Sequence, residues 1–569
     1  MKLRKLAVGI LIGALVLALG SCSMAVYHIT NVTELQEMNN DLAGDYILDN
    51  DIDAVETKTW NGGLGFDPIG TWGGIAFTGS FDGQGHKITG LFINRPATNW
   101  VALFGYTDGA PFLKNVIFEN CNITGQRYAA ALAGWNDDDT DVIDCSVSGN
   151  VHVEKDIGGG LIGKQDGGKV TNCHSTAGVT GWVALGGLIG ILMDGVELSS
   201  CSATGDVLAF AFGGAGGAKV GGLIGEFGDS IVSDSYATGN VTAIEGPAPW
   251  WIGGFSGLAH NSIVTNCHAE GDVVTIADRA GGLLGNVRID SQITECSARG
   301  NVSGEDYIGG LTGENNKSEI IDCFAFGNVV AIQDFVGGLT GLNYDSIVLR
   351  CCAAGNTTGR NYVGGLIGYH AEATREAQVS ESHSLGSVQG NDYVGGLIGY
   401  NGADTSDCFS KSSTNGADLV GGFVGLNTAG DLISNSYSTG AVTGTGANVG
   451  GLIGQNIGTV SNSFWDTETS GQAASAGGTG LTTEEMKTKS TFTDAGWDFD
   501  TIWKIWELPV YEPSYPWLQA DGRCQCWDSQ PHPKQVLEPD NLLCEQRKNP
   551  TDVRDPFPEF SARHQGFKD

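Results

Sequence analysis

The chain has 569 residues, of which 88 are glycine and only 17% are charged. Its 65 acidic side chains outnumber 30 Lys and Arg, so the formal net charge is −35. This charge argues against nucleic acid or an anionic membrane surface as a partner, because both are bound through Lys and Arg. The hydrophobic content of 41% is enough for a core, and glycine recurs at fixed spacing, which excludes low-complexity disorder.

Residues 1–21 have the pattern of an export signal, with a basic start followed by an apolar run from Leu6 to Leu19. The run ends in Leu-Gly-Ser before Cys22, which resembles a bacterial lipobox. We therefore expect an exported protein, at the outer surface or in the periplasm, anchored by lipidation of Cys22. Secretion after ordinary cleavage is the alternative. No later apolar run reaches the ~18 residues of a membrane span, so the lipid would be the only membrane attachment.

Residues 22–98 are predicted to form an N-terminal capping unit. Thr33 and Gln36 have the spacing of a capping box, which predicts a short helix that stops at Gly44. A strand is predicted from Tyr46 to Ile52. A solenoid leaves the core of its first coil open, so we expect the helix to lie over that end.

Residues 99–465 repeat one box, best seen as V-G-G-L-I-G-Y-N at positions 394–401. Its copies are spaced by 26 to 35 residues, and a period in this range indicates a repeat architecture. Thirteen copies align on a central apolar residue: Leu103, Leu132, Leu161, Leu188, Leu223, Phe255, Leu283, Leu311, Leu339, Leu366, Leu397, Phe423 and Leu452.

A second motif, C-x-A-x-G-N-V, follows most boxes, as at Cys296 to Val302. Its Cys, Ala, Gly and Val alternate, so in a strand they share one face. The units predict an all-β fold, a right-handed parallel β-helix of about 13 coils. A propeller is the rival, but it needs ~40 residues per blade. Gly-Asn pairs such as Gly300-Asn301 are expected at bends, with the Asn side chains hydrogen-bonded along the rod.

The box followed by C-x-A-x-G-N-V resembles the GLUG repeat, and the likeness extends over residues 27–517. The resemblance implies a secreted or surface protein of bacteria, since the family includes adhesin-like proteins and non-catalytic parts of some IgA-specific metalloendopeptidases. It implies an architecture and no reaction.

Residues 466–519 are predicted to be a C-terminal capping segment. Five aromatic residues are expected to cover the open core of the last coil: Trp497, Phe499, Trp503, Trp506 and Trp517. Thr482 and Glu485 have a capping-box spacing. Residues 520–569 change to a charged, Pro-containing composition and are predicted to be a flexible or separately stapled tail.

Nine cysteines share one column of the repeat, in which Ser235, Ser382, Ser436 and Ser463 take the same place. A metal site or a disulfide would not accept Ser, so we predict buried structural thiols. The three remaining tail cysteines could pair, but not all with each other: Cys524, Cys526 and Cys544.

Two features are candidate binding sites. Asp137, Asp138, Asp139 and Asp141 concentrate oxygen ligands in one turn, so calcium is a possible cofactor, with a solvated acidic turn as the alternative. Insertions in two consecutive units are expected to place four aromatic residues in one patch: Phe210, Phe212, Trp250 and Trp251. A loop packed onto the rod is the alternative to that patch.

The chain contains no H-E-x-x-H and no G-x-S-x-G motif, so no catalytic residue is predicted. The sequence favours a non-catalytic surface rod for binding or adhesion, whose partners would be glycans or surface and matrix proteins. A carbohydrate-active enzyme on the same β-helix and a passive stalk are the two alternatives.

Overall fold

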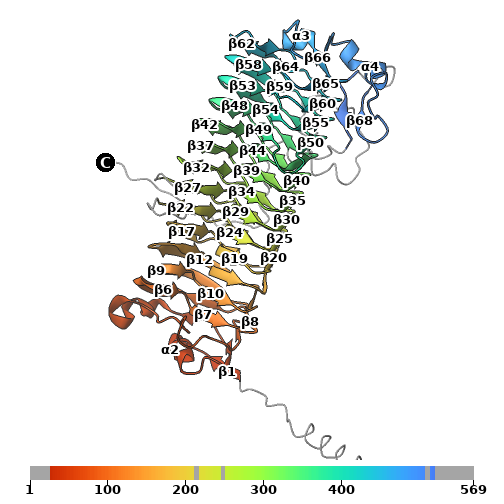
Figure 1. Cartoon of the computed structure of the whole chain (residues 1–569). Helices are drawn as coiled ribbons and strands as arrows, with labels where there is room; N and C mark the ends of the chain where they lie inside the picture. Colours follow the sequence, from red (N-terminus) through yellow and green to blue (C-terminus); the bar gives the residue numbers. More distant parts are fainter. Residues whose placement is uncertain (1–25, 211–216, 245–249, 507–512, 520–569) are drawn as a thin grey trace, which may run out of the picture.

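The computed structural model describes residues 26–210, 217–244, 250–506 and 513–519. Parallel strands stack into a long solenoid around one continuous hydrophobic core (Figure 1). One sheet has 16 strands, from β1 (Val26–Ile29) to β65 (Thr459–Ser461). A second sheet has 13, from β7 (Phe104–Asp108) to β64 (Ile453–Asn456), and most of the remaining strands pair into a third sheet. The predicted parallel β-solenoid of about 13 coils is confirmed.

One coil shows the plan of the others. Its strands are β43 (Val336–Gly337), β44 (Thr340–Tyr344), β45 (Ile347–Leu349), β46 (Cys352–Ala353) and β47 (Thr357–Thr358). Each strand pairs in parallel with its equivalent in the next coil, so the hydrogen bonds run along the rod.

The corners of a coil are made by residues in the left-handed region that are not glycine. In the same coil these are Phe335 (φ 61°), Asp345 (φ 51°) and Arg350 (φ 51°). Such a conformation is uncommon for a bulky residue, so the stacked neighbours must hold it in place. Glycine does not mark these corners, so the sequence analysis did not predict them.

The glycine box supplies the centre of the core, and all thirteen of its apolar central residues are fully buried. Its glycines lie where the backbones of successive coils approach each other. A Cβ on Gly396 would lie 2.0 Å from the carbonyl oxygen of Gly422 in the next coil. The box is therefore scaffold, and close packing explains its glycines.

The cysteine column is a buried structural ladder, as predicted. The nine cysteines of the column are buried and free. Serine serves equally well: the backbone N–H of Cys201 donates to Oγ of Ser235 at 3.0 Å, and that of Cys351 to Oγ of Ser382 at 3.0 Å. Burial raises the pKa of the Cys121 thiol to about 12. These thiols fill space and satisfy backbone groups rather than react.

The predicted Asn ladder is also confirmed. Side-chain oxygens of Asp272, Asn301 and Asn328 accept the backbone N–H of the following coil at 2.8, 3.1 and 3.0 Å. A second ladder lies inside the core, where the Asn343 amide donates to Nδ1 of His370 at 3.0 Å. His370 is fully buried, and desolvation lowers its pKa to about 4.

His370 should make the rod sensitive to mild acid. Unfolded chain binds a proton near pH 6.5, whereas folded His370 binds one only near pH 4, so stability falls as the pH drops through this interval. The loss is on the order of 3 kcal/mol at pH 4. In His370→Asn, which copies Asn401 of the next coil, this part of the loss should disappear. Urea unfolding of both proteins at pH 7 and pH 4.5 measures it, and an equal loss in both would contradict the assignment.

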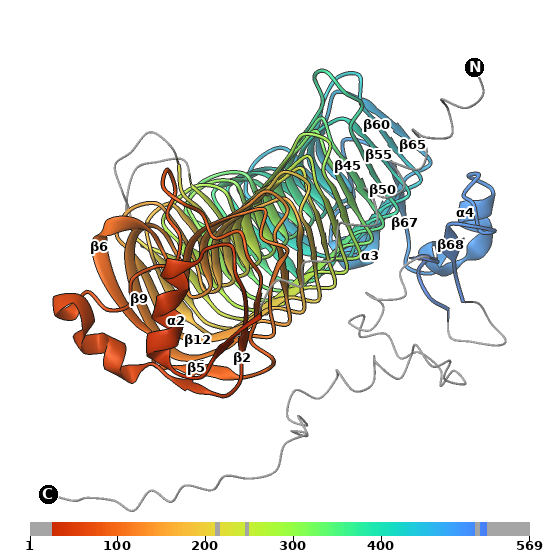
Figure 2. The same cartoon turned by 90° about the horizontal axis from the view of Figure 1, so that it is seen from below.

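The N-terminal cap contains α2 (Val32–Glu37), followed by the 3₁₀ turn η1 (Met38–Asn40). Leu35 and Met38 pack into the main core, and α2 lies at the N-terminal end of the stack (Figure 2). The predicted capping residue Thr33 is wrong. Asn31 is the N-cap, because its Oδ1 accepts the backbone N–H of Glu34.

The rest of the N-terminal unit is built from short elements. Strand β2 spans Asp45–Leu48 and β3 spans Ile52–Asp53, where one strand was predicted, and η2 (Val55–Gly63) follows. Phe66 and Phe77 are fully buried in the same core, so the unit is continuous with the repeats.

The C-terminal aromatic residues lie on the flank of the rod, so the prediction that they cover its end is wrong. Nε1 of Trp503 donates to Asp407, Nε1 of Trp497 donates to the Asn462 carbonyl, and Tyr437 Oη donates to the Pro516 carbonyl. Figure 1 shows this segment beside β55 (Asp404–Ser406) and β60 (Leu432–Ser434). Its own elements are α3 (Thr467–Ser470), η3 (Glu485–Lys487), α4 (Lys489–Thr493), β68 (Trp503–Lys504) and β69 (Trp517–Leu518).

The end of the last coil is closed by a short stretch near position 475. The Gly451 N–H donates to the Ala474 carbonyl at 3.0 Å, and the Ile453 N–H donates to Oγ of Ser475 at 2.8 Å. Trp465, in β66 (Phe464–Asp466), is buried in the same core. The predicted Thr482–Glu485 capping box is present: Oε2 of Glu485 accepts the backbone N–H of Thr482 at 2.8 Å. Within the described ranges, no helix is long and apolar enough to cross a membrane.

Candidate functional site

Four aromatic rings stand together on the outward side of the first coils. Trp100 and Tyr128 occupy equivalent left-handed corners of successive coils, and their rings stack at 5.8 Å with planes 4° apart. Trp135, in β10 (Ala133–Asp137), stacks on Tyr128 at 5.6 Å. Trp72 reaches over them, 5.6 Å from Trp100 and 6.2 Å from Trp135, and remains 50% exposed. A large indole that is half exposed on an aromatic base is a typical contact surface for a ligand.

Charged and polar groups border these rings. Nε1 of Trp135 donates to Oδ2 of Asp166 at 2.8 Å. Lys164 Nζ lies 2.5 Å from the same oxygen and 4.4 Å from the Trp135 ring centroid. Tyr106 Oη donates to Oδ2 of Asp137 at 2.8 Å. The rings and these four residues form what we call the tryptophan–aspartate site: Trp72, Trp100, Tyr128, Trp135, Tyr106, Asp137, Lys164 and Asp166.

The two carboxylates come from adjacent coils. Asp137 follows Asn136, whose partner in the next strand, β14 (Ile162–Asp166), is Gln165, so Asp137 and Asp166 are level. Asp166 is only 6% exposed, and burial raises its pKa in spite of Lys164. Its second oxygen, Oδ1, is buried and accepts no hydrogen bond from the residues that the structure describes. A buried acceptor without a donor is costly, and a ligand hydroxyl would satisfy it once the side chains that cover the oxygen move aside.

The predicted calcium site is not supported, because its carboxylates do not converge. Asp137 accepts from Tyr106, Asp139 accepts the Gly168 N–H at 3.1 Å, and Asp141 accepts the Lys169 N–H at 2.9 Å. Asp138 is a left-handed corner residue. Throughout the described ranges, no three His, Cys, Asp or Glu side chains are grouped to hold a metal ion. The acidic turn instead fixes the next coil, and Asp137 belongs to the tryptophan–aspartate site.

The predicted aromatic patch on the two insertions does not form as expected. Trp250 is only 1% exposed and packs in the core. Phe210 contacts Trp182, with ring centroids 6.0 Å apart, and Phe212 lies outside the described residues. Trp251 is partly exposed beneath Arg288, whose guanidinium lies 4.9 Å from its ring. The predicted lipidation site, Cys22, also lies outside the described residues.

A longer aromatic ladder occupies the same outward corner farther along the rod. Tyr307, Phe335, Tyr362 and Tyr393 stack in sequence at 4.7, 4.9 and 4.5 Å. The interior rings of this ladder have both faces against neighbouring rings, so they mainly stabilise the stack of coils. Among the described residues, no half-exposed ring covers this ladder as Trp72 covers the first one, so the tryptophan–aspartate site is the better candidate for a binding surface.

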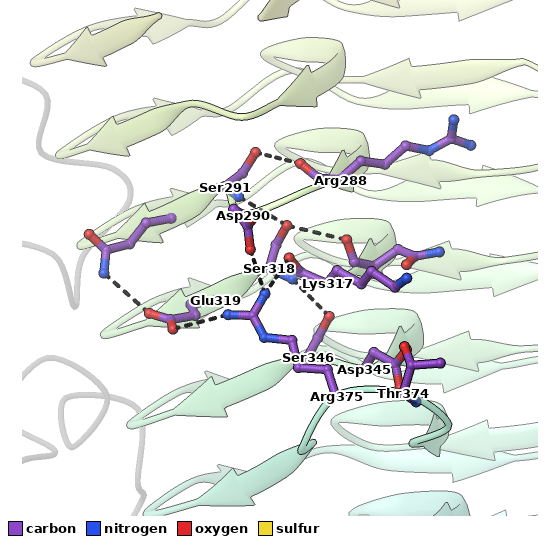
Figure 3. A network of polar contacts seen from close by, with 12 residues as sticks. Arg288, Asp290, Ser291, Lys317, Ser318, Glu319, Asp345, Ser346, Thr374 and Arg375 are labelled. Atoms are coloured by element: carbon purple, nitrogen blue, oxygen red, sulfur yellow. Dashed lines mark hydrogen bonds and ion pairs between the residues drawn. The ribbon is translucent and has the colours of Figure 1, made fainter. Parts of the chain in front are cut away.

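An insertion at residues 372–377 was not predicted from the sequence, although the 31-residue spacing from Leu366 to Leu397 indicates it. Its Arg375 reaches back along the rod to Asp290 at 2.7 Å and to the Lys317 carbonyl at 3.1 Å (Figure 3). Asp345 accepts the N–H of Thr374 at 3.0 Å, and such hydrogen bonds lower its pKa to about 2. The insertion is therefore a clasp on the rod rather than a free binding loop.

Removing the clasp should loosen the insertion without unfolding the rod. In Arg375→Ala, an exposed ion pair is lost, so we expect a change in unfolding free energy below about 1 kcal/mol. Cleavage by a glutamate-specific protease at Glu372 or Glu376 should become several-fold faster. Arg360→Ala, which removes the Asp334 ion pair two coils away from Asp290, is the control and should leave this cleavage unchanged. Unaltered cleavage in Arg375→Ala would mean that the clasp does not order the loop.

Comparison with known proteins identifies the repeat. The model of the family described as the GLUG motif matches residues 252–274 and 416–443, so the chain carries GLUG motifs. A protein of Evansella cellulosilytica described as a Gly-rich membrane protein is 52% identical over 79 residues, which is 13% of this chain and 9% of that protein. Halomucin of Haloquadratum walsbyi is 38% identical over 146 residues, 24% of this chain and 2% of halomucin.

An immunoglobulin A1 protease of Streptococcus sanguinis is 28% identical over 228 residues, 38% of this chain and 12% of the protease. A crystal structure of a Bacteroides ovatus protein described as an immunoglobulin A1 protease aligns with 54% of this chain and 78% of its own, at 18% identity and a TM-score of 0.32. The chain thus spans only a small part, 2% to 12%, of these curated relatives.

Proposed function

We propose that the protein is an exported, non-catalytic binding rod that holds a glycan at the tryptophan–aspartate site. The observation that carries this proposal is the half-exposed indole of Trp72 on its base of near-parallel rings, next to an unsatisfied buried acceptor on Asp166. Flat apolar faces of sugar rings fit such an indole, and a sugar hydroxyl would supply the donor that Asp166 Oδ1 lacks once the side chains over this oxygen move aside. Export is supported by the signal-like residues 1–21 and by relatives such as the Gly-rich membrane protein.

The charges narrow the class of glycan. The chain carries a formal charge of −35, and the site itself has two aspartates against Lys164, which is already paired. An anionic polysaccharide would meet like charge over the whole rod, and the cost would grow at low ionic strength. The ligand should therefore be a neutral or amino-sugar glycan.

A glycan array with the folded protein, carrying neutral, amino-sugar and uronic-acid or sialylated chains, tests this function. Binding to neutral or amino sugars, with no signal on the anionic ones, is the expected result. Titration at two salt concentrations adds a check, because binding led by the indole should change little with salt. An empty array would favour the passive stalk, and preference for anionic glycans would contradict the charge argument.

A carbohydrate-active enzyme is the second candidate, and one observation favours it. Asp137 and Asp166 are level on adjacent coils, and burial raises the pKa of Asp166. Glycoside hydrolysis uses such a pair, one carboxyl protonated and the other ionised. The Lys164 contact to Asp166 opposes the protonated form, so binding without turnover remains the proposal. If a bound glycan released reducing ends and Asp166→Asn abolished this release, an enzyme would replace the binding rod as the function.

A further inference from the structure

Two consecutive coils carry the same pair of tyrosines. The unit N-Y-V-G-G-L-I-G-Y at positions 361–369 returns as D-Y-V-G-G-L-I-G-Y at positions 392–400. The strands of the two units, neighbours in Figure 1, are β48 (Asn361–Gly364), β49 (Ile367–Ala371), β53 (Asp392–Gly395) and β54 (Ile398–Gly402). The parallel register aligns the two units residue by residue, so each tyrosine of one coil lies beside its equivalent in the next.

The four tyrosines form two stacked pairs that bridge the coils. The ring centroids of Tyr369 and Tyr400 are 4.4 Å apart, with planes only 5° apart. Those of Tyr362 and Tyr393 are 4.5 Å apart, with planes 16° apart. The Tyr362 and Tyr369 rings meet edge to face at 5.8 Å, so the two pairs touch. All four rings are partly exposed.

The Tyr369–Tyr400 pair is isolated within its own column. The equivalent residue is Leu342 in the preceding coil and Leu426 in the following coil. The other pair continues, because Phe335 stacks on the second face of Tyr362 at 4.9 Å. Among the described residues, Tyr369 and Tyr400 therefore each have one ring stacked on a face, and it is the ring of the partner phenol.

Other tyrosine pairs in the described part of the chain are more widely spaced and more firmly held. The Tyr27 and Tyr46 rings stack at 5.1 Å and 24°, but Tyr46 is only 5% exposed. Tyr27 Oη donates to Oδ2 of Asp41 at 3.1 Å, and Tyr46 Oη donates to the Asp41 carbonyl at 2.7 Å. The Tyr437 and Tyr515 rings are 6.3 Å apart. Within the described ranges, Tyr369 and Tyr400 are the closest and most nearly parallel of these pairs.

Phenols stacked face to face are arranged for oxidative coupling. A tyrosine that loses one electron and one proton carries its unpaired electron on the oxygen and the ring carbons, in orbitals perpendicular to the ring. Two stacked radicals point these orbitals at each other. Burial raises the pKa of Tyr369 to about 12, with the Tyr400 phenol as the next cause, so Tyr369 begins as a neutral phenol that must lose both particles.

We propose that Tyr369 and Tyr400 are a modification site, which hydrogen peroxide and a haem peroxidase convert into dityrosine. Each phenol gives one electron and one proton, and together these reduce one peroxide to two water molecules. The two radicals form a carbon–carbon bond between ortho positions, and each ortho hydrogen is then replaced on the phenol oxygen as a proton. The bond ties adjacent coils in parallel with their backbone hydrogen bonds, so these coils stay joined when the rod frays.

Trypsin separates the two tyrosines, because it places Tyr369 in peptide 361–375 and Tyr400 in peptide 376–411. Dilute folded protein is treated with hydrogen peroxide and a haem peroxidase, and the monomer is isolated in denaturant, reduced and digested. Mass spectrometry should find the two peptides joined, lighter by two hydrogen atoms than their sum, with fragments that place the bond at the two tyrosines. Recovery of the peptides only as separate species, in a reaction that converts free N-acetyltyrosine into dityrosine, would overturn the proposal.

Two variants that keep all four rings identify the bonded pair. Tyr400→Phe removes only the phenol oxygen, and Phe335 in the neighbouring column shows that phenylalanine fits such a stack, so the variant should fold and lose the joined species. Tyr393→Phe makes the same change in the other pair, between the same two peptides, and should retain it. Far-UV circular dichroism checks both folds. Loss of the joined species in Tyr393→Phe with its retention in Tyr400→Phe would place the bond on Tyr362 and overturn the assignment.

Discussion

Trp72→Ala should weaken glycan binding at least tenfold while the rod stays folded. The indole is 50% exposed and comes from a loop, so its removal opens no cavity in the core. It does remove most of the flat surface on which a sugar ring would lie, and tenfold in affinity corresponds to about 1.4 kcal/mol. Calorimetry with the best glycan from the array measures the loss, and far-UV circular dichroism checks the fold.

Trp251→Ala is the matched control for that experiment. Trp251 is also a partly exposed tryptophan on the outward corner, and it belongs to the patch that the sequence predicted. Its replacement should leave the affinity unchanged, because Trp251 lies several coils from Trp100. If Trp251→Ala weakened binding and Trp72→Ala did not, the site would have to move to the insertions.

The sequence predicts the scaffold well and the site poorly, for a physical reason. Core positions such as Leu397 repeat in every coil, so their common environment shows as a pattern. The tryptophan–aspartate site occurs once, and Trp72 lies outside the repeat. The acidic turn at Asp137 was noticed, but its composition suggested calcium. Only the stacking of coils shows that Asp137 accepts a hydrogen bond from Tyr106, whose ring contacts Trp135.

A weaker signal for the site was present in the sequence. Trp100, Tyr128, Tyr362 and Tyr393 each occupy the position just before a glycine box, where the backbone turns into the left-handed region. Equivalent positions of a solenoid lie side by side, so aromatic residues there must form stacks. The sequence does not show which of these stacks has an exposed face. That depends on Trp72, which lies in a loop whose position the repeat does not specify.

Buried and exposed aromatic residues were also hard to separate. Trp250 and Trp251 are neighbours in an insertion, yet one is 1% exposed and the other lies at the surface. Alternation along a strand puts adjacent side chains on opposite faces, but the start of β28 (Trp251–Gly253) fixes which one points inward. The C-terminal tryptophans were misplaced for a similar reason, since apolar composition shows that they bury and not which surface they cover.

Gly396→Ala should destabilise the rod severely, because it adds a methyl group where two coils are in contact. The added Cβ would lie 2.0 Å from the Gly422 carbonyl oxygen and 2.3 Å from Oγ of Ser410, far inside contact distance. Successive coils are held together by backbone hydrogen bonds, so they cannot separate without breaking the ladder on both sides. We expect a loss of more than about 4 kcal/mol, or failure to fold.

Gly178→Ala, at the start of β17 (Gly178–Gly181), provides the contrast that makes this result specific to close packing. There the nearest atom to an added Cβ is Oδ1 of Asn150, at 3.4 Å, so a methyl fits. Gly178→Ala should change the free energy of unfolding by no more than about 1 kcal/mol. The change should be a gain in stability, because alanine restricts the unfolded chain more than glycine does. Urea unfolding followed by circular dichroism compares the two variants. Equal midpoints would show that the box glycines serve flexibility, whereas a large gap would confirm that contact between coils requires them.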